Sequence, residues 1–284
     1  MQTAEGGDPA GVPVFVHHGS PGSAILDPAW ENDAAAKGLR LITYARPGFG
    51  RSTRAAGRVV ADAASDVAAI ADGLGIDRFL SWGVSGGGPH VLACAALLPD
   101  RVVAVASLAA AAPFDGEGLD FFAGMGPANV EEFGISVKGG EEAIRPLAVE
   151  RAAALKSGTQ EQMVEAMAPH LSSVDEAEMR GPIGATLLAH FQDAFSVSVD
   201  GWVDDDLAFI SPWGFKPSEI SVPVLLWQGR QDLMVPYGHG EWLAGQIPGV
   251  DARLTEEDGH LTLITRRIPE VHQWLRDRWD AQVR

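Results

Sequence analysis

The chain has 284 residues, of which 46% are apolar, and its 21 basic side chains stand against 38 acidic ones, a formal net charge of −17. This length and apolar content are sufficient for a large buried core, either in one α/β domain or in a domain with an insertion. The negative charge disfavours nucleic acids and anionic membranes as partners, because it repels their phosphate groups.

The cysteine and histidine content and the apolar runs exclude further classes of protein. A single cysteine, Cys94, excludes an intrachain disulfide and a cysteine metal cluster. The first eleven residues lack the features of a secretory signal, and every apolar run is too short or too charged to cross a membrane. We therefore expect a cytoplasmic protein whose first eleven residues form a loose end. No metal site is expected either, since no ligand spacing with carboxylates is found at His17, His170, His190, His239 and His272.

Six continuous apolar runs predict the strands of a parallel sheet, because strands buried on both faces do not alternate apolar and polar residues. The runs cover residues 12–18, 39–45, 77–83, 101–109, 222–228 and 250–256. Helical patterns lie between most of them, at residues 62–74, 86–98 and 238–247, and another follows the last run at 262–280. Strands that alternate with helices in this way indicate βαβ units, with helices on both faces of the sheet.

One long interval between residues 113 and 221 breaks this alternation, although a crossover between parallel strands needs only about a dozen residues. The interval carries helix signals at residues 141–156, 159–171 and 173–180. In the last of these, Ser173 and Glu176 have the spacing of a capping box. We expect an inserted helical lid over residues 114–215, and a core formed by residues 1–113 and 216–284.

The stretch from Gly83 to Gly87 reads G-x-S-x-G, with Ser85 at its centre. An apolar strand ends just before the serine and an apolar helix begins just after it, which is the context of a nucleophile elbow. A glycine-rich phosphate loop or an ordinary turn remains the alternative, but no lysine follows as in a Walker motif. The sequence therefore predicts Ser85 as a nucleophile above the end of a strand.

A serine nucleophile needs a base to take its proton, and the base needs an acid to orient it. Asp232 follows the run at 222–228, and His260 follows the run at 250–256. Loops after parallel strands meet at one edge of the sheet, so we expect both side chains near Ser85. Asp115 and Asp258 remain alternative acids, and Asp258 is expected to be a surface turn residue.

The chain resembles the α/β-hydrolase fold family, and within it the lidded, cofactor-free serine hydrolases. The resemblance rests on "HHGSPGS", "YARPGFGRS", "GVSGGG", "GRQDLMVP" and "DGH", and it covers residues 12–113 and 222–284. It implies a mostly parallel central sheet, no cofactor, and a triad of Ser85 as nucleophile, Asp232 as acid and His260 as base. Family members usually have a β-hairpin before the "HG" strand, and its apparent lack here suggests a shortened sheet.

The resemblance also implies an oxyanion hole formed by the backbone N–H groups of Ser20 and Gly86. An ordinary glycine–proline turn is the alternative reading of the "HHGSPGS" stretch. We expect His18 to brace this loop, and Arg46 to form a structural ion pair rather than to bind substrate.

We expect a serine hydrolase that cleaves an ester, lactone, thioester or amide bond of a small to medium, largely apolar substrate. The pocket is expected to be lined by Phe121, Phe122, Met125, Trp202 and Trp213, since ligand pockets are mostly apolar. A proline-iminopeptidase-like aminopeptidase is one alternative, although no acidic pair for a substrate amine is identifiable. A non-hydrolytic small-molecule receptor or lyase is the other.

Overall fold

A computed structural model describes residues 1–168 and 171–283. Within these residues one seven-stranded sheet has the order β1-β3-β2-β4-β5-β6-β7. Its strands are β1 (Thr3–Gly7), β2 (Val12–His17), β3 (Leu39–Tyr44), β4 (Phe79–Val84), β5 (Val102–Leu108), β6 (Val224–Gly229) and β7 (Asp251–Thr255). Strands β2 to β7 are parallel, as the six apolar runs predict, and the mostly parallel architecture is confirmed.

The first residues of the chain form an edge strand, so the prediction of a loose end is wrong. Strand β1 runs antiparallel to β3, in register from Thr3 opposite Tyr44 to Gly7 opposite Arg40. An edge strand can be held by backbone hydrogen bonds without burying apolar side chains, and "TAEGG" therefore lacks the pattern of a buried strand.

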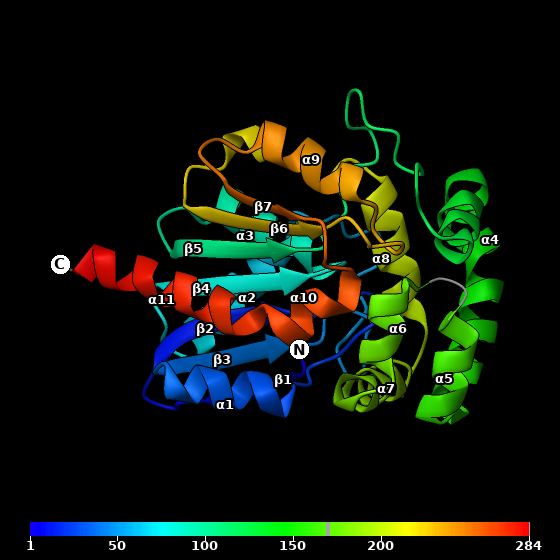
Figure 1. Cartoon of the computed structure of the whole chain (residues 1–284), viewed down its shortest axis with the longest axis horizontal. Coiled ribbons are helices and arrows are strands. Elements are labelled where there is room, and N and C mark those ends of the chain that lie inside the picture. The colour runs from blue at the N-terminus through cyan, green and yellow to red at the C-terminus, as the bar shows by residue number, and fades with distance from the viewer. Residues whose placement is uncertain (169–170, 284) are drawn as a thin grey trace.

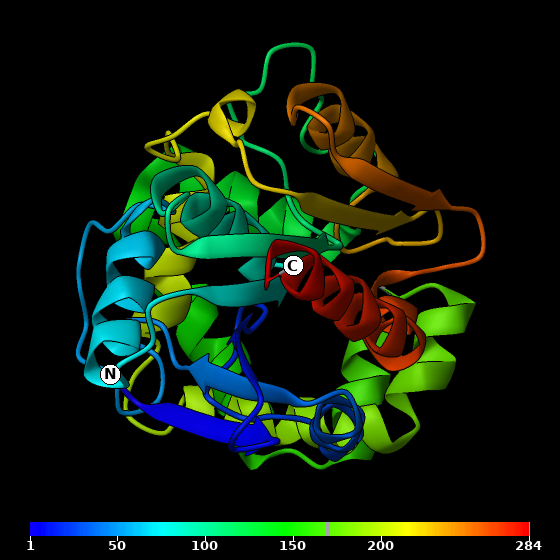
Figure 2. The same cartoon turned by 90° about the vertical axis from the view of Figure 1, so that its left-hand side faces the viewer.

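Helices cover both faces of the sheet, as Figures 1 and 2 show. Apolar side chains of α1 and α11 pack on one face, and those of α2, α3 and α9 pack on the other. The sequence did not predict α1, in which only two residues are buried. The predicted helix at 262–280 is two helices that meet at Arg267, because Pro269 fits the first turn of a new helix. The helices are α1 (Pro28–Ala36), α2 (Asp62–Gly73), α3 (Gly87–Leu97), α9 (Tyr237–Gln246), α10 (His260–Arg266) and α11 (Ile268–Val283).

The residues from 114 to 215, called the 114–215 segment below, carry further helices beyond the carboxyl ends of the strands (Figure 1). Its helices are α4 (Pro127–Ser157), α5 (Gln160–Met167), α6 (Ser173–Met179), α7 (Pro182–Ala194) and α8 (Asp200–Ile210). Helix α4 bends at Gly140, whose φ of 58° is left-handed. The placement of these helices puts them over the edge of the sheet where α/β proteins gather their sites.

The capping box predicted at Ser173 and Glu176 is wrong. The residue that precedes α6 is Ser172, and its hydroxyl donates to Asp175 Oδ2 at 3.1 Å rather than closing a box. A reciprocal capping box does form at the start of α5, between Thr159 and Gln162. No box closes at α6 because the carboxylate of Asp175 bonds to the backbone of another helix, α10.

Candidate active site

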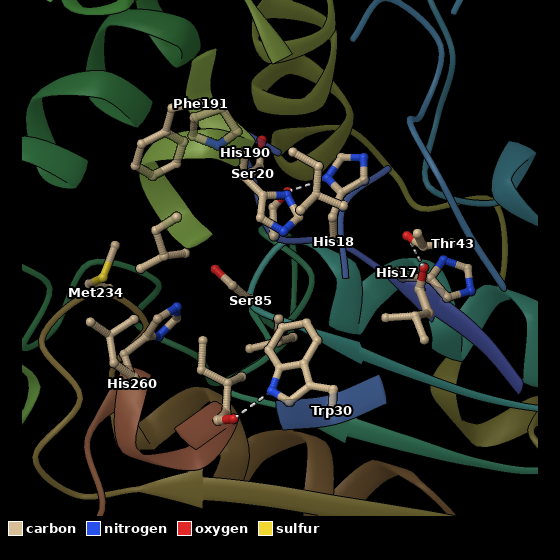
Figure 3. Close-up of a pocket in the computed structure, with 18 of the residues that line it drawn as sticks. His17, His18, Ser20, Trp30, Thr43, Ser85, His190, Phe191, Met234 and His260 are labelled. Atoms are coloured by element: carbon tan, nitrogen blue, oxygen red, sulfur yellow. Dashed lines mark hydrogen bonds between the residues drawn. The ribbon is translucent and has the colours of Figure 1, made fainter. Parts of the chain in front are cut away.

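Ser85 occupies a strained turn between β4 and α3. Its φ of 55° lies in the left-handed region, its N–H donates to Leu108 O at 2.9 Å, and its carbonyl accepts from Gly88 N at 2.9 Å. A Cβ at Gly87 would overlap the carbonyl oxygen of His17, so glycine at this position lets the helix approach the sheet. Figure 3 shows the Ser85 hydroxyl directed into a cavity, as the elbow motif predicts.

His260 is the first residue of α10 and is paired with Asp232. The imidazole Nδ1 donates to Asp232 Oδ2 at 2.7 Å, and both side chains are buried. Asp232 Oδ1 accepts from the N–H groups of Met234 and Val235, each at 2.8 Å, and Gln228 Nε2 donates to Oδ2 at 3.1 Å. These contacts leave the carboxylate one orientation and place the His260 proton on Nδ1, so Nε2 is free to accept a proton.

The surroundings of His260 favour its charged form. Burial lowers the pKa of the imidazole, but the charge and hydrogen bond of Asp232, together with the charge of Asp175, raise the pKa above its usual value. Within the described residues, Ser85 Oγ and the His260 ring line the same cavity without a hydrogen bond between them. Such a contact commonly tightens only when substrate is bound. Both side chains therefore reach the same cavity.

The two alternative acids lie away from the imidazole. Asp258 is buried, accepts from Thr255 Oγ1 at 2.8 Å and pairs with Arg267 Nε at 3.1 Å, so its prediction as a surface residue is wrong. A Cβ at Gly229 would overlap the backbone of Asp258, which shows how closely the loop after β7 packs on β6. Asp115 is exposed in the loop after β5.

The backbone of the "HHGSPGS" loop lies beside the nucleophile. A Cβ at Gly86 would be 3.1 Å from Ser20 N, so the two predicted oxyanion donors are neighbours. The Gly19 carbonyl accepts from His18 Nδ1 at 2.6 Å and from Arg46 Nη2 at 3.0 Å. The C=O and N–H of a trans peptide point in opposite directions, so these bonds direct the Ser20 N–H away from Arg46. Within residues 1–168 and 171–283, neither the Ser20 nor the Gly86 amide donates a backbone hydrogen bond.

Arg46 holds this loop through a buried ion pair, which confirms the expected structural roles of Arg46 and His18. Its Nη1 donates to His18 O at 2.6 Å, and its Nη2 pairs with Asp205 Oδ2 at 2.6 Å. Asp205 lies on α8 and also pairs with Arg58 at 2.6 Å. Because the two arginines surround it, the pKa of the Asp205 carboxyl lies below its usual value despite full burial.

Ser85 and His260 open onto a cavity of about 80 Å³ (Figure 3). An adjoining cavity of about 260 Å³ shares part of its wall, including Phe191 and Met234. No described residue lining the smaller cavity is acidic. Its apolar wall comes from both the core and the 114–215 segment, and comprises Val16, Pro21, Ile25, Trp30, Trp82, Val84, Met167, Met179, Leu187, Phe191, Met234, Leu261 and Ile264.

The residues predicted to line the pocket lie elsewhere, with one exception. Trp202 lines the adjoining cavity, whereas Phe121, Phe122, Met125 and Trp213 line neither cavity. The Phe121 ring packs at 4.9 Å from the His239 ring, and Trp213 borders a separate surface groove. The loop that carries the phenylalanines packs over α9, while methionine and leucine side chains of α5 to α7 reach the cavity.

His190 lines the cavity, although no sequence pattern predicts this position for it. Its Nδ1 accepts from Ser23 N–H at 3.2 Å, and burial lowers its pKa to about 4. The ring is therefore neutral, with its proton on Nε2. His170 lies outside the described residues. Among those that are described, no group of three or more His, Cys, Asp or Glu side chains could hold a metal ion.

No helix in the described part of the chain combines the length and apolar character that crossing a membrane requires.

Three solved structures are similar over nearly the full chain. An enol-lactonase from Burkholderia xenovorans LB400 is 21% identical, with 98% of this chain and 96% of that chain covered and a TM-score of 0.64. A thermophilic esterase from Thermogutta terrifontis is 23% identical, with 97% and 93% covered and a TM-score of 0.65. A bromoperoxidase from Bacillus anthracis is 23% identical, with 96% and 93% covered and a TM-score of 0.69. At these identities, the structural similarity shows a shared fold and nothing about activity.

The family model described as alpha/beta hydrolase fold matches residues 12–266. This match spans the sheet from β2 to β7, the elbow at Ser85 and the pair of Asp232 and His260. The chain therefore belongs to the alpha/beta hydrolase fold family.

Proposed function

We propose that this protein is a serine hydrolase that cleaves an ester or lactone bond of a small, largely apolar substrate. Family membership supports a hydrolase. The observation that carries the serine mechanism is the buried Asp232–His260 pair, at 2.7 Å, on the same cavity as the Ser85 hydroxyl. The names of the enol-lactonase and the esterase, which share the fold, agree with this choice of bond.

The geometry supports the following reaction. Ser85 Oγ attacks the substrate carbonyl carbon while His260 Nε2 takes the hydroxyl proton, and Asp232 stabilises the imidazolium. The amides of Ser20 and Gly86 donate to the oxyanion of the tetrahedral intermediate. His260 then gives its proton to the leaving alcohol, which leaves an acyl-enzyme. A water molecule, deprotonated by His260, then attacks this ester, and His260 passes that proton to Ser85 Oγ as the acyl–oxygen bond breaks, which releases the acid and the free serine.

The cavity favours an uncharged acyl group over the amine of a peptide. Apolar residues, including methionine, leucine, isoleucine and phenylalanine, form most of the wall around Ser85. Glu132 does line the adjoining cavity, but it accepts from Trp202 Nε1 and pairs with Arg151, each at 2.8 Å. Its oxygens are already bonded, which disfavours the aminopeptidase alternative.

The 114–215 segment is proposed to act as a lid. Its helices α5, α6 and α7 supply Met167, Met179 and Phe191 to the cavity wall. Substrate selection would then depend on these side chains together with Met234 from the core.

Labelling with a fluorophosphonate probe tests the proposed nucleophile. The folded protein is expected to incorporate the probe at Ser85, and the Ser85→Ala variant is expected to lose it completely. Ser65→Ala, which removes an exposed serine hydroxyl from α2, is the control and should label normally. Absence of labelling in the folded wild-type protein would reject the nucleophile and favour a receptor or lyase. Turnover of p-nitrophenyl esters and lactones, but not of aminoacyl anilides, is expected in parallel.

A further inference from the structure

Asp175 joins the 114–215 segment to the proposed base. It lies on α6 with a fully buried side chain, and α6 packs against α10. Its Oδ2 accepts from His260 N at 2.7 Å, and its Oδ1 accepts from Leu261 N at 2.7 Å and Thr262 N at 3.2 Å. The first N–H groups of a helix have no partner inside the helix, so one carboxylate satisfies three of them here.

A glycine before α10 leaves space for the Asp175 carboxylate. The residue before α10 is Gly259, which has no side chain that could cap the helix. A Cβ at this position would overlap the Asp175 carboxylate. Ser172 Oγ donates to Asp175 Oδ2 at 3.1 Å and fixes the carboxylate from its own side. A residue 85 positions away in the chain therefore takes the place of a local cap.

Asp175 also acts on the charge of the imidazole. Two carboxylates face His260: Asp232, which contacts the ring, and Asp175, which contacts its backbone, and both raise the pKa of His260. The other charged groups nearby are engaged elsewhere: Asp258 pairs with Arg267 at the end of α10, and Arg266 pairs with Glu178 of α6 at the surface.

We propose that Asp175 is a positioning residue for His260. It fixes the backbone of the base at the start of α10, and its charge stabilises the imidazolium that forms when Ser85 gives up its proton. The proposal rests on the proposed function, and it makes the 114–215 segment a structural part of the catalytic machinery as well as a wall of the cavity.

The Asp175→Asn variant tests the proposal, because it keeps the shape of the side chain and removes its charge. Titration of the His260 ring by NMR, assigned with a His260→Gln variant, should show a pKa lower by about one unit. The acid limb of kcat/KM for a p-nitrophenyl ester should move to lower pH by a similar amount. We expect kcat to fall about tenfold with little change in KM. Should this variant not fold, Asp175→Ser supplies a smaller neutral acceptor for the same titration.

Asp258→Asn is the matched control. It removes another buried carboxylate, two residues before His260, that is bonded to Arg267 instead of to α10. The pKa of His260 and the acid limb should stay at their wild-type values in this variant. An unchanged pKa in Asp175→Asn, or an equal fall in Asp258→Asn, would overturn the proposal. The NMR titration needs no turnover, so a protein that fails to label at Ser85 can still show whether Asp175 acts on His260.

Discussion

At the scale of single residues, the orientation of His260 depends on how completely Asp232 is bonded. Its two oxygens accept four hydrogen bonds, from two backbone amides, from Gln228 and from the imidazole itself. A carboxylate held in this way cannot rotate easily, because all four hydrogen bonds would have to break. The imidazole is consequently fixed in one tautomer, with Nε2 facing the cavity.

Replacing Asp232 by asparagine is predicted to change both the rate and its pH dependence. The base must be neutral, and its pKa is raised above the usual 6.5, so wild-type kcat/KM should rise with pH through a value above 6.5. Asp232→Asn removes the largest stabilisation of the imidazolium, so the limb should move to lower pH. We expect kcat to fall by about 10³- to 10⁴-fold. Initial rates on a p-nitrophenyl ester between pH 5 and pH 9 (roughly the range in which histidine titrates) measure both effects.

Asp115→Asn serves as the control for this variant, since it removes an exposed carboxylate after β5. It should leave the rate and the profile unchanged. A loss of turnover in Asp115→Asn, with activity retained in Asp232→Asn, would assign the acid to the earlier strand.

At the scale of elements, the site depends on how closely α3 approaches the sheet. Strand β4 ends at Val84 and α3 begins at Gly87, so Ser85 and Gly86 alone make the turn. The glycine positions around the turn face backbone: a Cβ at Gly83 would overlap Gly87 O, and one at Gly87 would overlap His17 O. The left-handed φ of Ser85 can persist because these contacts leave the turn no other path.

Gly87→Ala is predicted to destabilise the protein, because its methyl group must displace the backbone of β2 or the start of α3. We expect the free energy of unfolding to fall by about 1–3 kcal/mol, the usual cost of overpacking. Urea denaturation followed by circular dichroism measures this change. Gly134→Ala, in α4 with no atom near the added carbon, is the control and should stabilise by up to about 1 kcal/mol. Equal stabilities of the two variants would contradict the close approach.

At the scale of the whole molecule, buried ion pairs join the 114–215 segment to the core. Asp205 on α8 pairs with Arg46 and Arg58 of the core, and Arg46 in turn holds the carbonyls of His18 and Gly19. A second, partly exposed ion pair joins Arg54 to Asp204 of the same helix. Both ion pairs connect the same two parts of the molecule, but Arg46 of the first also holds the loop that carries Ser20, the proposed oxyanion donor.

Arg46→Lys is predicted to lower kcat by about tenfold to a hundredfold, less than the loss of a complete oxyanion donor. A lysine keeps the charge beside Asp205, but it cannot reproduce the planar set of donors that holds the two carbonyls. Turnover of a p-nitrophenyl ester and the rate of fluorophosphonate labelling should fall together. Arg54→Lys alters the ion pair with Asp204 instead, and it should leave both rates near those of the wild type. If both variants lose activity equally, the effect lies in the attachment of the segment and not in the loop.

Features encoded locally could be predicted from the sequence. The six parallel strands appear as apolar runs, and Ser85 appears as a serine between glycines where a strand pattern becomes a helix pattern. Strand β1 could not be recognised, because its pairing with β3 depends on backbone groups that carry no side-chain pattern. Helix α1 escaped recognition for a related reason, since only Trp30 and Ala34 are buried.

The sequence by itself determined the six parallel strands of the sheet, the elbow and the order of serine, aspartate and histidine, because hydrophobic periodicity and parallel topology place the ends of strands at one edge. Only the tertiary structure decided which carboxylates contact His260, which loop Arg46 holds and which side chains line the cavity. Asp175 and His260 are 85 residues apart, and Arg46 and Asp205 are 159 apart. Contacts of this kind depend on how helices pack across the end of the sheet, and a local pattern of residues does not record that packing.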